Sequence, residues 1–271
     1  MKIRYLFIVL IFCSCENPHH NKAPLKKPKV QSYPKQHKVL TDSINATIDL
    51  GDEASFDELP KLSFENIGES EYLTYKQNAQ INDMDTNPSH LVSTDSSFTL
   101  YTSKAKLVYK KRNKFTPSRD VSTVEYKGFI NNLKAYFFNE TNIGDDFEIS
   151  QSFLIDSVNN IRYDFISRFD GATTAPAMSV NKKYFFYYEN GIMTGSADTE
   201  ENNSFIGVIE ISENGQPYQE LSSFTTTKWN IEDGVWVNNN AIALKLNQRK
   251  YVDHKWLNSY RYRIATLPLN R

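Results

Sequence analysis

Cysteine, histidine and glycine are scarce in this 271-residue chain, and each shortage excludes a class of chemistry. The cysteines are Cys13 and Cys15, so the sequence beyond them has no disulfide, thiolate metal site or cysteine nucleophile. Two of the five histidines, His90 and His254, lie beyond residue 41, and no Gly-x-Ser-x-Gly elbow accompanies them. The ten glycines form no phosphate-binding loop motif. We therefore expect no catalytic residue set, cofactor or metal site in this chain.

Long hydrophobic runs are also missing, apart from a short one at the N-terminus. Lys2 and Arg4 precede the apolar run Leu6–Phe12, and the small residue Ser14 stands directly before Cys15. This order is typical of a secretory signal peptide. A helix that spans a bilayer needs roughly 20 apolar residues, so the sequence predicts a signal peptide rather than a permanent transmembrane helix.

The residues Leu10-Ile11-Phe12-Cys13-Ser14-Cys15 resemble a bacterial lipoprotein signal, in which a small residue precedes the cysteine that becomes acylated. The resemblance implies a signal peptide over residues 1–14 and a diacylated Cys15 as the new N-terminus. It departs from the usual pattern at Phe12 and Cys13, where smaller aliphatic residues are commoner. It also implies a lipid-anchored location in the bacterial cell envelope, at the outer membrane or the periplasmic face, because two acyl chains hold a protein durably on a membrane. Ordinary secretion is the alternative.

Charge is distributed unevenly along the chain. Residues 1–41 hold eight basic residues and one acidic residue, which leaves 23 basic and 31 acidic residues beyond. Residues 15–41 are rich in proline and lysine, a composition that predicts an extended tether of about 3.1 Å per residue. Residues 42–71 are acidic, and we expect them to form a partly ordered approach to a domain at 72–271. Because this body is acidic, its composition argues against nucleic acid as a partner.

Residues 72–271 carry the period-two alternation of β-strands. The run YRYRIA (260–265) alternates tyrosine or isoleucine on one face, which we expect to be buried, with arginine on the other. The runs AIALKL and AKLVYKK alternate in the same way, and asparagine-rich breaks between such runs predict tight hairpin turns. The sequence therefore predicts an all-β domain of antiparallel hairpins, either a small or incomplete propeller-like body or a β-sandwich.

Two aromatic stretches allow more specific predictions. Residues 126–137 fit helical spacing as well as a hairpin, but Gly128 and the Asn131-Asn132 pair favour the hairpin. The run Tyr184-Phe185-Phe186-Tyr187-Tyr188 is apolar on both faces. It therefore predicts a central strand that is covered on two sides.

The stretch APAMSVNKKYFFYYENG (175–191) resembles the repeat unit of TolB-type β-propellers. The resemblance departs from the repeat at Val180, where a proline is usual, and at the Asn-Lys turn, where Asp-Gly is usual. It implies a propeller blade, and at about 40–45 residues per blade the body has room for about four or five blades. The matching residues are Pro176, Ser179, Asn181, Lys182, Lys183 and Tyr184.

Three tryptophans near the C-terminus are the candidate contacts with a ligand or partner. Trp229, Trp236 and Trp256 lie within the last 43 residues. An exposed indole buries a large area at low entropic cost, and it can stack on a sugar or anchor a protein partner. Because 13% of the chain is aromatic, core packing is the favoured reading for each of them, with a binding face as the alternative.

Acidic clusters are weaker candidates. The stretches 145–148 and 198–201 could supply the two carboxylates of a glycosidase, which must lie about 5–9.5 Å apart. Residues 83–87 space three oxygen ligands as a calcium loop does, but the glycine and glutamate of that loop are missing. The alternative for all three stretches is a solvated polar loop.

Together these features predict a membrane-anchored envelope lipoprotein that acts as a non-enzymatic binding or interaction module. Its expected partners are the lipid bilayer, through acylated Cys15, and an envelope protein or glycan. One alternative is a glycan-binding protein or carbohydrate-active enzyme. Another is an immunity or assembly factor for an envelope partner.

Overall fold

The computed structural model describes residues 43–51, 58–79, 84–86, 91–111, 121–143, 148–191, 202–212, 216–252 and 255–268. The chain divides into two compact units, 1–37 and 38–271, and every described residue belongs to the second. The expected signal peptide, the acylated Cys15 and the tether therefore lie outside the described residues.

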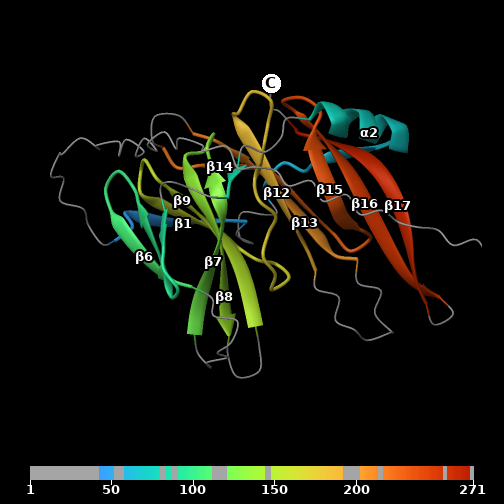
Figure 1. Cartoon of the computed structure of the whole chain (residues 1–271). Helices are drawn as coiled ribbons and strands as arrows, with labels where there is room; N and C mark the ends of the chain where they lie inside the picture. Colours follow the sequence, from blue (N-terminus) through green and yellow to red (C-terminus); the bar gives the residue numbers. More distant parts are fainter. Residues whose placement is uncertain are drawn as a thin grey trace, which may run out of the picture. The chain divides into compact units, whose positions relative to one another are not determined.

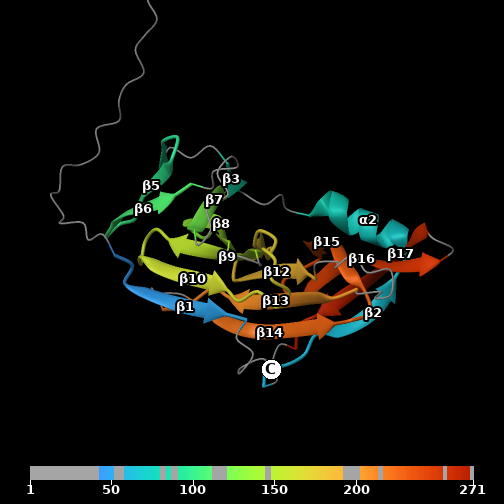
Figure 2. The same ribbon diagram turned by 90° about the horizontal axis from the view of Figure 1, so that it is seen from below.

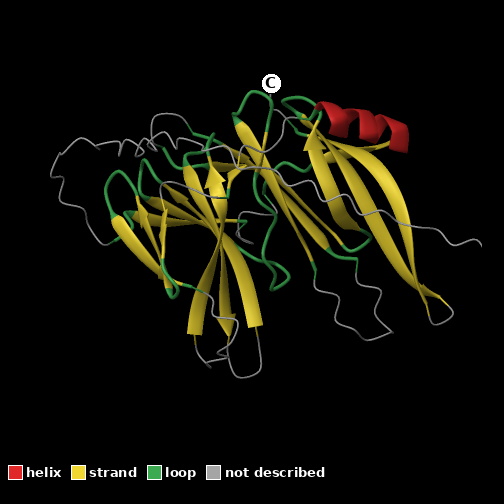
Figure 3. Ribbon diagram, viewed as in Figure 1, coloured by secondary structure: helices red, strands yellow, loops and turns green. Residues whose placement is uncertain are grey.

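The described residues are mostly β, as the sequence predicts (Figure 3). A helix, α2 (Glu69–Asn78), lies between the second and third strands. No helix in this part of the chain is long and apolar enough to cross a membrane. In chain order the strands are β1 (Ala46–Leu50), β2 (Ser63–Ile67), β3 (Met84–Asp85), β4 (Leu91–Ser93), β5 (Ser97–Tyr101), β6 (Lys106–Lys110), β7 (Val121–Ile130), β8 (Ala135–Ile143), β9 (Glu148–Asp156), β10 (Ile161–Phe165), β11 (Ala177–Met178), β12 (Tyr184–Asn190), β13 (Ser204–Glu210), β14 (Gln219–Thr226), β15 (Asn230–Trp236), β16 (Ala241–Val252) and β17 (Lys255–Thr266).

These strands form four sheets that follow one another along the chain (Figures 1 and 2). We name them by their consecutive strands: the β4–β6 sheet, the β7–β10 sheet, the β11–β14 sheet and the β15–β17 sheet. Neighbouring strands in each of these series pair antiparallel. This series of antiparallel sheets agrees with the predicted sandwich-like or incomplete propeller body.

Two strands come from the acidic segment 42–71. Strand β1 pairs in parallel with β10, and β2 pairs antiparallel with β17. Each of them forms one edge of its sheet. The segment that we expected to be a partly ordered approach thus contributes directly to two sheets of the body.

Among the described residues, three apolar cores separate the four sheets. Period-two alternation explains the arrangement, because neighbouring side chains on a strand point to opposite faces. Phe137 of β8 packs in the core between the β7–β10 and β11–β14 sheets, while Phe138 packs in the core against the β4–β6 sheet. The third core lies between the β11–β14 and β15–β17 sheets and contains Trp229, Trp236 and Leu244.

Strand β12 is the central aromatic strand that the sequence predicts. Phe185 and Tyr187 face the core toward the β7–β10 sheet, and Phe186 faces the core toward the β15–β17 sheet. The predicted hairpin at 126–137 is also confirmed, since β7 and β8 pair across a turn in which Lys134 has φ 50°.

The turn between β11 and β12 shows why serine and asparagine occupy the positions that resemble a propeller repeat. Ser179 is fully buried, and its Oγ accepts a hydrogen bond from the backbone N–H of Tyr184 at 3.0 Å. The Asn181 side chain accepts from the N–H of Lys183 at 3.1 Å. Lys182 adopts a positive φ of 59° between them. The two side chains satisfy backbone donors that the tight turn leaves unpaired.

The prediction for the run YRYRIA is wrong about its buried face. Ala265 is the fully buried residue of the run, and it lies in the core below the β15–β17 sheet. Tyr260 and Tyr262 lie on the face of the strand opposite Ala265. Tyr260 is 46% exposed there, and Tyr262 lies beside helix α2. The aromatic residues therefore mark the outer face of this sheet. The neighbouring run AIALKL behaves as predicted, since Ile242, Leu244 and Leu246 are buried.

Candidate functional site

Helix α2 lies on the outer face of the β15–β17 sheet (Figure 1). Glu69 and Glu71 in its first turn and Lys76 in its last turn match the helix dipole. Its apolar residues do not gather on one side, and Tyr72 is the helix residue that is buried. The helix is therefore held on the sheet by polar contacts as much as by apolar burial.

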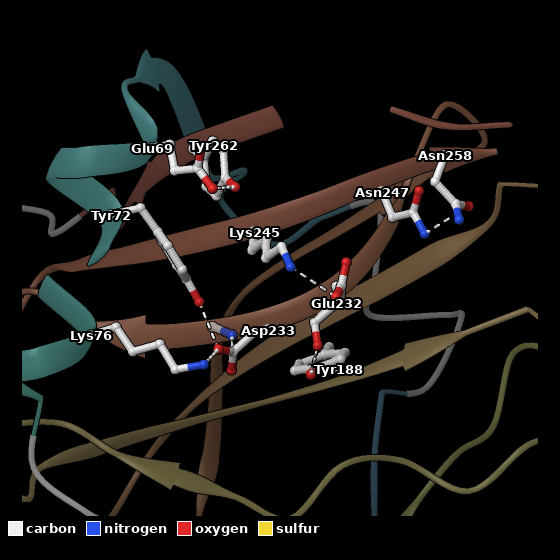
Figure 4. A network of polar contacts seen from close by, with 11 residues as sticks. Glu69, Tyr72, Lys76, Tyr188, Glu232, Asp233, Lys245, Asn247, Asn258 and Tyr262 are labelled. Carbon is white, nitrogen blue, oxygen red and sulfur yellow. Dashed lines mark hydrogen bonds and ion pairs between the residues drawn. The ribbon is translucent and has the colours of Figure 1, made fainter. Parts of the chain in front are cut away.

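The polar contacts converge on Asp233 of β15 (Figure 4). The Tyr72 hydroxyl and the Lys76 ammonium both donate to Asp233 Oδ2, each at 2.6 Å. A third contact holds the start of the helix, where the Tyr262 hydroxyl donates to Glu69 at 2.7 Å. The centres of the Tyr72 and Tyr262 rings lie 5.2 Å apart, so the two rings are in contact between helix and sheet.

A β-bulge in β15 explains why Asp233 reaches the helix. The register with β16 shifts between Ile231 and Asp233, which leaves Glu232 as an extra residue. A bulge bends its strand and re-aims the adjacent side chains. Asp233 receives the bonds from the helix, whereas the neighbouring Glu232 accepts a hydrogen bond from Lys245 of β16 at 2.9 Å.

The environment shifts the acidities of this network. Partial burial alone would raise the pKa of Asp233, but the hydrogen bonds from Lys76 and Tyr72 hold that pKa below its usual value. Burial and the bond to Asp233 raise the pKa of Tyr72. Burial also raises the pKa of Tyr188 to about 12, with the nearby charges of Asp233 and Glu232 adding to the shift. At neutral pH Asp233 is therefore a carboxylate, and the Tyr72 and Tyr188 phenols are neutral.

A pocket of about 290 Å³ lies beside this network. Its walls come from the C-terminal end of α2, from β11 and the turn after it, and from the end of β15. Tyr75 and Asn78 supply polar groups from the helix, and the remaining lining is apolar. The lining residues are Tyr75, Asn78, Ala79, Ala177, Met178, Val180, Gly234, Val235, Trp236 and Val237. An apolar lining with a few convergent polar groups is the usual composition of a small-ligand site.

A second polar cluster lies within the β7–β10 sheet. Arg162 of β10 donates from Nη2 to Glu140 and from Nε to Asp164, each at 2.6 Å. The guanidinium also lies 3.9 Å from the centre of the Phe153 ring. The three charged side chains are 14–17% exposed. Burial raises the pKa of Asp164, whereas bonds from Ser122 and Arg162 outweigh burial and lower the pKa of Glu140.

This cluster has the two carboxylates of unequal acidity that acid–base catalysis uses. Both carboxylates are bound to the same guanidinium, and neither of them lines the pocket beside α2. We therefore assign the Glu140–Arg162–Asp164 cluster to the packing of its sheet.

The structure divides the three predicted tryptophan contacts. Trp229 and Trp236 are buried in the core below the β15–β17 sheet, at 5% and 6% exposure. Trp236 also reaches the pocket wall, and its indole N–H donates to the Ala177 carbonyl at 2.8 Å. Trp256 of β17 is 36% exposed, and the Arg249 guanidinium lies 5.0 Å from the centre of its ring.

The other sequence candidates fall mostly outside the described residues. These include His90 and His254, the acidic stretch 198–201 and most of 145–148. Asp85 is described as an exposed residue of β3, but the other two members of its cluster are not. Among the described residues, no three His, Cys, Asp or Glu side chains lie close enough together to hold a metal ion.

Sequence reasoning missed helix α2 and both polar clusters. The acidic first turn and the basic last turn of α2 are a helix signal that could have located it. In the strand IRYDF, the oppositely charged Arg162 and Asp164 stand two apart and alternate with apolar residues. This spacing is a sequence signal that could have indicated a charge pair on one face of the strand. No local pattern marks Asp233 as the partner of a helix that lies 157 residues before it.

Neither a scan against protein-family models nor a search of curated proteins finds a match to this chain. The assignment of function therefore depends on the residues themselves.

Proposed function

We propose that this protein is a membrane-anchored envelope lipoprotein whose β-body binds a ligand or partner without catalysis. The proposal combines the lipoprotein-like signal at Cys15 with the pocket beside α2. Acylation would place the protein on the membrane, and the pocket would supply the binding site. The observation that carries the binding role is a pocket whose lining combines apolar side chains with the polar side chains of Tyr75 and Asn78.

The pocket fits an apolar group that carries a polar end. Met178, Val235 and Trp236 provide apolar contact, while Tyr75 and Asn78 provide hydrogen-bonding groups at the helix end. Its volume of about 290 Å³ lies at the small end of ligand pockets. An aromatic ring, a short acyl chain or one side chain of a partner protein meets these requirements.

The titratable groups beside the pocket support binding rather than catalysis. Asp233 is held in its charged form by Lys76 and Tyr72, and Tyr75 donates its hydroxyl proton to Glu71 at 2.9 Å. The contacts of Asp233 hold helix α2 on the sheet, and the Tyr75–Glu71 bond joins two residues within the helix. A ligand in the pocket would therefore bind against a wall that these contacts fix in advance, which reduces the entropic cost of binding.

A pocket-filling substitution tests the binding role. Ala79→Phe places a ring in the pocket, and we expect it to reduce the binding of the fluorescent probe 8-anilinonaphthalene-1-sulfonate. Leu73→Phe is the matched control, because Leu73 is 45% exposed on the same helix and does not line the pocket. Equal probe binding by both variants would contradict a binding role for this pocket.

Acyl labelling tests the anchoring role. We expect radiolabelled palmitate to be incorporated by the unaltered chain and by Cys13→Ser, and to be lost in Cys15→Ser. An unaltered chain that takes up no label and fractionates as a soluble protein would overturn the anchoring part of the proposal.

The glycan-binding alternative has less support. It needs exposed indoles beside an acidic pair, but Trp229 and Trp236 are buried. Their buried packing places two of its three candidate residues in the core between two sheets.

A further inference from the structure

The hairpin of β16 and β17 extends beyond the sheet to which it belongs (Figure 1). The last pair between β15 and β16 is Asn230 with Asn247, and the last pair between β17 and β2 is Tyr262 with Ile67. The pairing of β16 with β17 continues past both points to Val252 and Lys255. We call residues 248–252 and 255–261 the outer ribbon.

Large apolar side chains are concentrated on the outer ribbon. Ten large hydrophobic residues are exposed in the described part of the chain, and four of them lie between positions 252 and 260. Single exposed apolar residues are ordinary, but a cluster marks a protein or membrane contact. The four residues and their exposed fractions are Val252 (44%), Trp256 (36%), Leu257 (54%) and Tyr260 (46%).

These side chains occupy both faces of the ribbon. Trp256 and Tyr260 share the face that continues toward helix α2, because residues two apart on a strand lie on the same side. Leu257 lies on the opposite face, level with Lys250 across the ribbon. A contact that used all four residues would therefore approach the end of the ribbon rather than one of its faces.

Basic residues surround the apolar ones. Strands β16 and β17 contain six lysine or arginine residues and no acidic residue, whereas the chain beyond residue 41 has an excess of acidic residues. Arg249 and Lys245 lie 5.0 and 4.4 Å from the ring centres of Trp256 and Tyr260. Four of the six basic residues lie on the outer ribbon, and Asp253, between its two strands in the sequence, is the acidic residue of this hairpin. The ribbon is thus a net basic, aromatic projection from an acidic body. The six basic residues are Lys245, Arg249, Lys250, Lys255, Arg261 and Arg263, of which Lys245 and Arg263 lie outside the ribbon.

We infer that the outer ribbon docks on the surface of a bilayer that contains anionic phospholipids. Tryptophan and tyrosine favour the membrane–water interface, where the ring is buried and its polar atom remains hydrated. Each lysine or arginine near an anionic surface contributes about 1 kcal/mol. The charge contrast also orients the protein, because the same surface repels the acidic remainder of the body.

This inference deepens the proposed function, since an acylated Cys15 would already hold the chain at a membrane. A ribbon contact would add a second attachment, and two linked attachments bind more tightly than either alone. The two attachments nevertheless use different residues, so they can be tested separately.

The chain offers a direct test because its cysteines, Cys13 and Cys15, can both be replaced. In the full chain carrying Cys13→Ser and Cys15→Ser, Leu257→Cys is labelled with the environment-sensitive dye NBD. Val108→Cys, which is 61% exposed on β6, provides a labelled control site on another sheet. The labelled proteins are mixed with vesicles of phosphatidylcholine alone or of phosphatidylcholine with phosphatidylglycerol.

We expect a blue shift and brighter emission from the dye at 257 with phosphatidylglycerol vesicles, and no change at 108. Lys250→Gln and Lys255→Gln should each weaken the vesicle affinity measured by the dye at 257 about fivefold. Trp256→Ala should reduce the blue shift, and its folding is checked by circular dichroism.

Three outcomes would overturn the inference. Unchanged emission at 257 with both vesicle types would show that the ribbon does not enter a bilayer. An equal response at 108 would indicate non-specific adsorption. The same response to soluble polyglutamate would identify an acidic polypeptide as the partner. Because acylation is absent from this experiment, none of these outcomes bears on the anchoring role of Cys15.

Discussion

Strands β12 and β17 are both rich in aromatic residues, yet they occupy opposite environments. In β12, Phe185, Phe186 and Tyr187 are at most 1% exposed, since a core covers each face of its sheet. In β17, Tyr260 and Trp256 are exposed, because they lie on the outer ribbon, past the last pairs of the hairpin with β15 and β2. The position of a strand among the sheets, rather than its composition, thus decides whether its aromatic side chains are packed in a core or remain exposed.

The largest expected difference between the two environments concerns the aromatic rings. Phe186→Ala should reduce the free energy of unfolding by about 3–5 kcal/mol, because it opens a cavity between two sheets. Tyr260→Ala should change it by less than about 0.5 kcal/mol, as is usual for surface substitutions. Urea denaturation measures both values. Similar losses in the two variants would show that the ribbon is packed in solution.

Arg162 and Lys245, which each lie over an aromatic ring, provide a similar comparison. Arg162→Met should cost about 3–5 kcal/mol, because it leaves Glu140 and Asp164 without their partner in a poorly hydrated site. Lys245→Met removes an ion pair with Glu232 that is more exposed, so its cost should stay below about 1 kcal/mol.

A rescue experiment checks the reason for the Arg162 effect. Adding Glu140→Gln and Asp164→Asn to Arg162→Met should recover much of the lost stability, because no unpaired charge then remains buried. Further destabilisation by these two changes would contradict this account.

Asp233 tests whether the polar contacts hold helix α2. Its folded pKa lies below its unfolded value, so its contribution to stability is present above the ordinary carboxyl pKa of about 4 and is lost as the pH falls through the folded pKa. Asp233→Asn should therefore cost up to about 1 kcal/mol at pH 7 and progressively less in acid. The measured quantity is the difference in unfolding free energy between the unaltered protein and Asp233→Asn as a function of pH. This difference should depend less on pH in a Lys76→Met background, because the bond from Lys76 is one cause of the lowered Asp233 pKa.

The buried Tyr187 provides a further comparison, within β12 itself. Among the described residues its buried hydroxyl has no hydrogen-bond partner, and a Cβ on the neighbouring Gly51 would lie 3.0 Å from the Tyr187 oxygen. Tyr187→Phe removes this hydroxyl and should change stability by less than about 1 kcal/mol, in either direction. Phe185→Ala on the same strand is the control for sensitivity to packing. A loss above about 2 kcal/mol for Tyr187→Phe would show that the hydroxyl forms a bond in solution.

The sequence supported correct predictions wherever a local pattern was sufficient. Alternation and asparagine-rich breaks predicted the all-β body, the hairpin at 126–137 and the central position of β12. The same alternation failed at YRYRIA, because a period of two separates the faces of a strand without saying which face meets a core. Helix α2 was missed because its apolar residues do not gather on one side.

The candidate site was less accessible to prediction. The sequence left Trp229 and Trp236 open between core packing and a binding face, and two facing sheets enclose them. The contacts of Asp233 with Tyr72 and Lys76 join segments that are far apart in the sequence, and they depend on a bulge of a single residue in β15. Neither feature has a local signature.

By itself the sequence determined that the body is built from antiparallel strands, because hydrophobic alternation and turn chemistry act over a few residues. It also determined the contrast between a basic N-terminal segment and an acidic body. Tertiary structure alone decided which aromatic residues are sealed between sheets and which remain on the outer ribbon. The physical reason is that burial depends on what covers a face, and the covering elements come from distant parts of the chain.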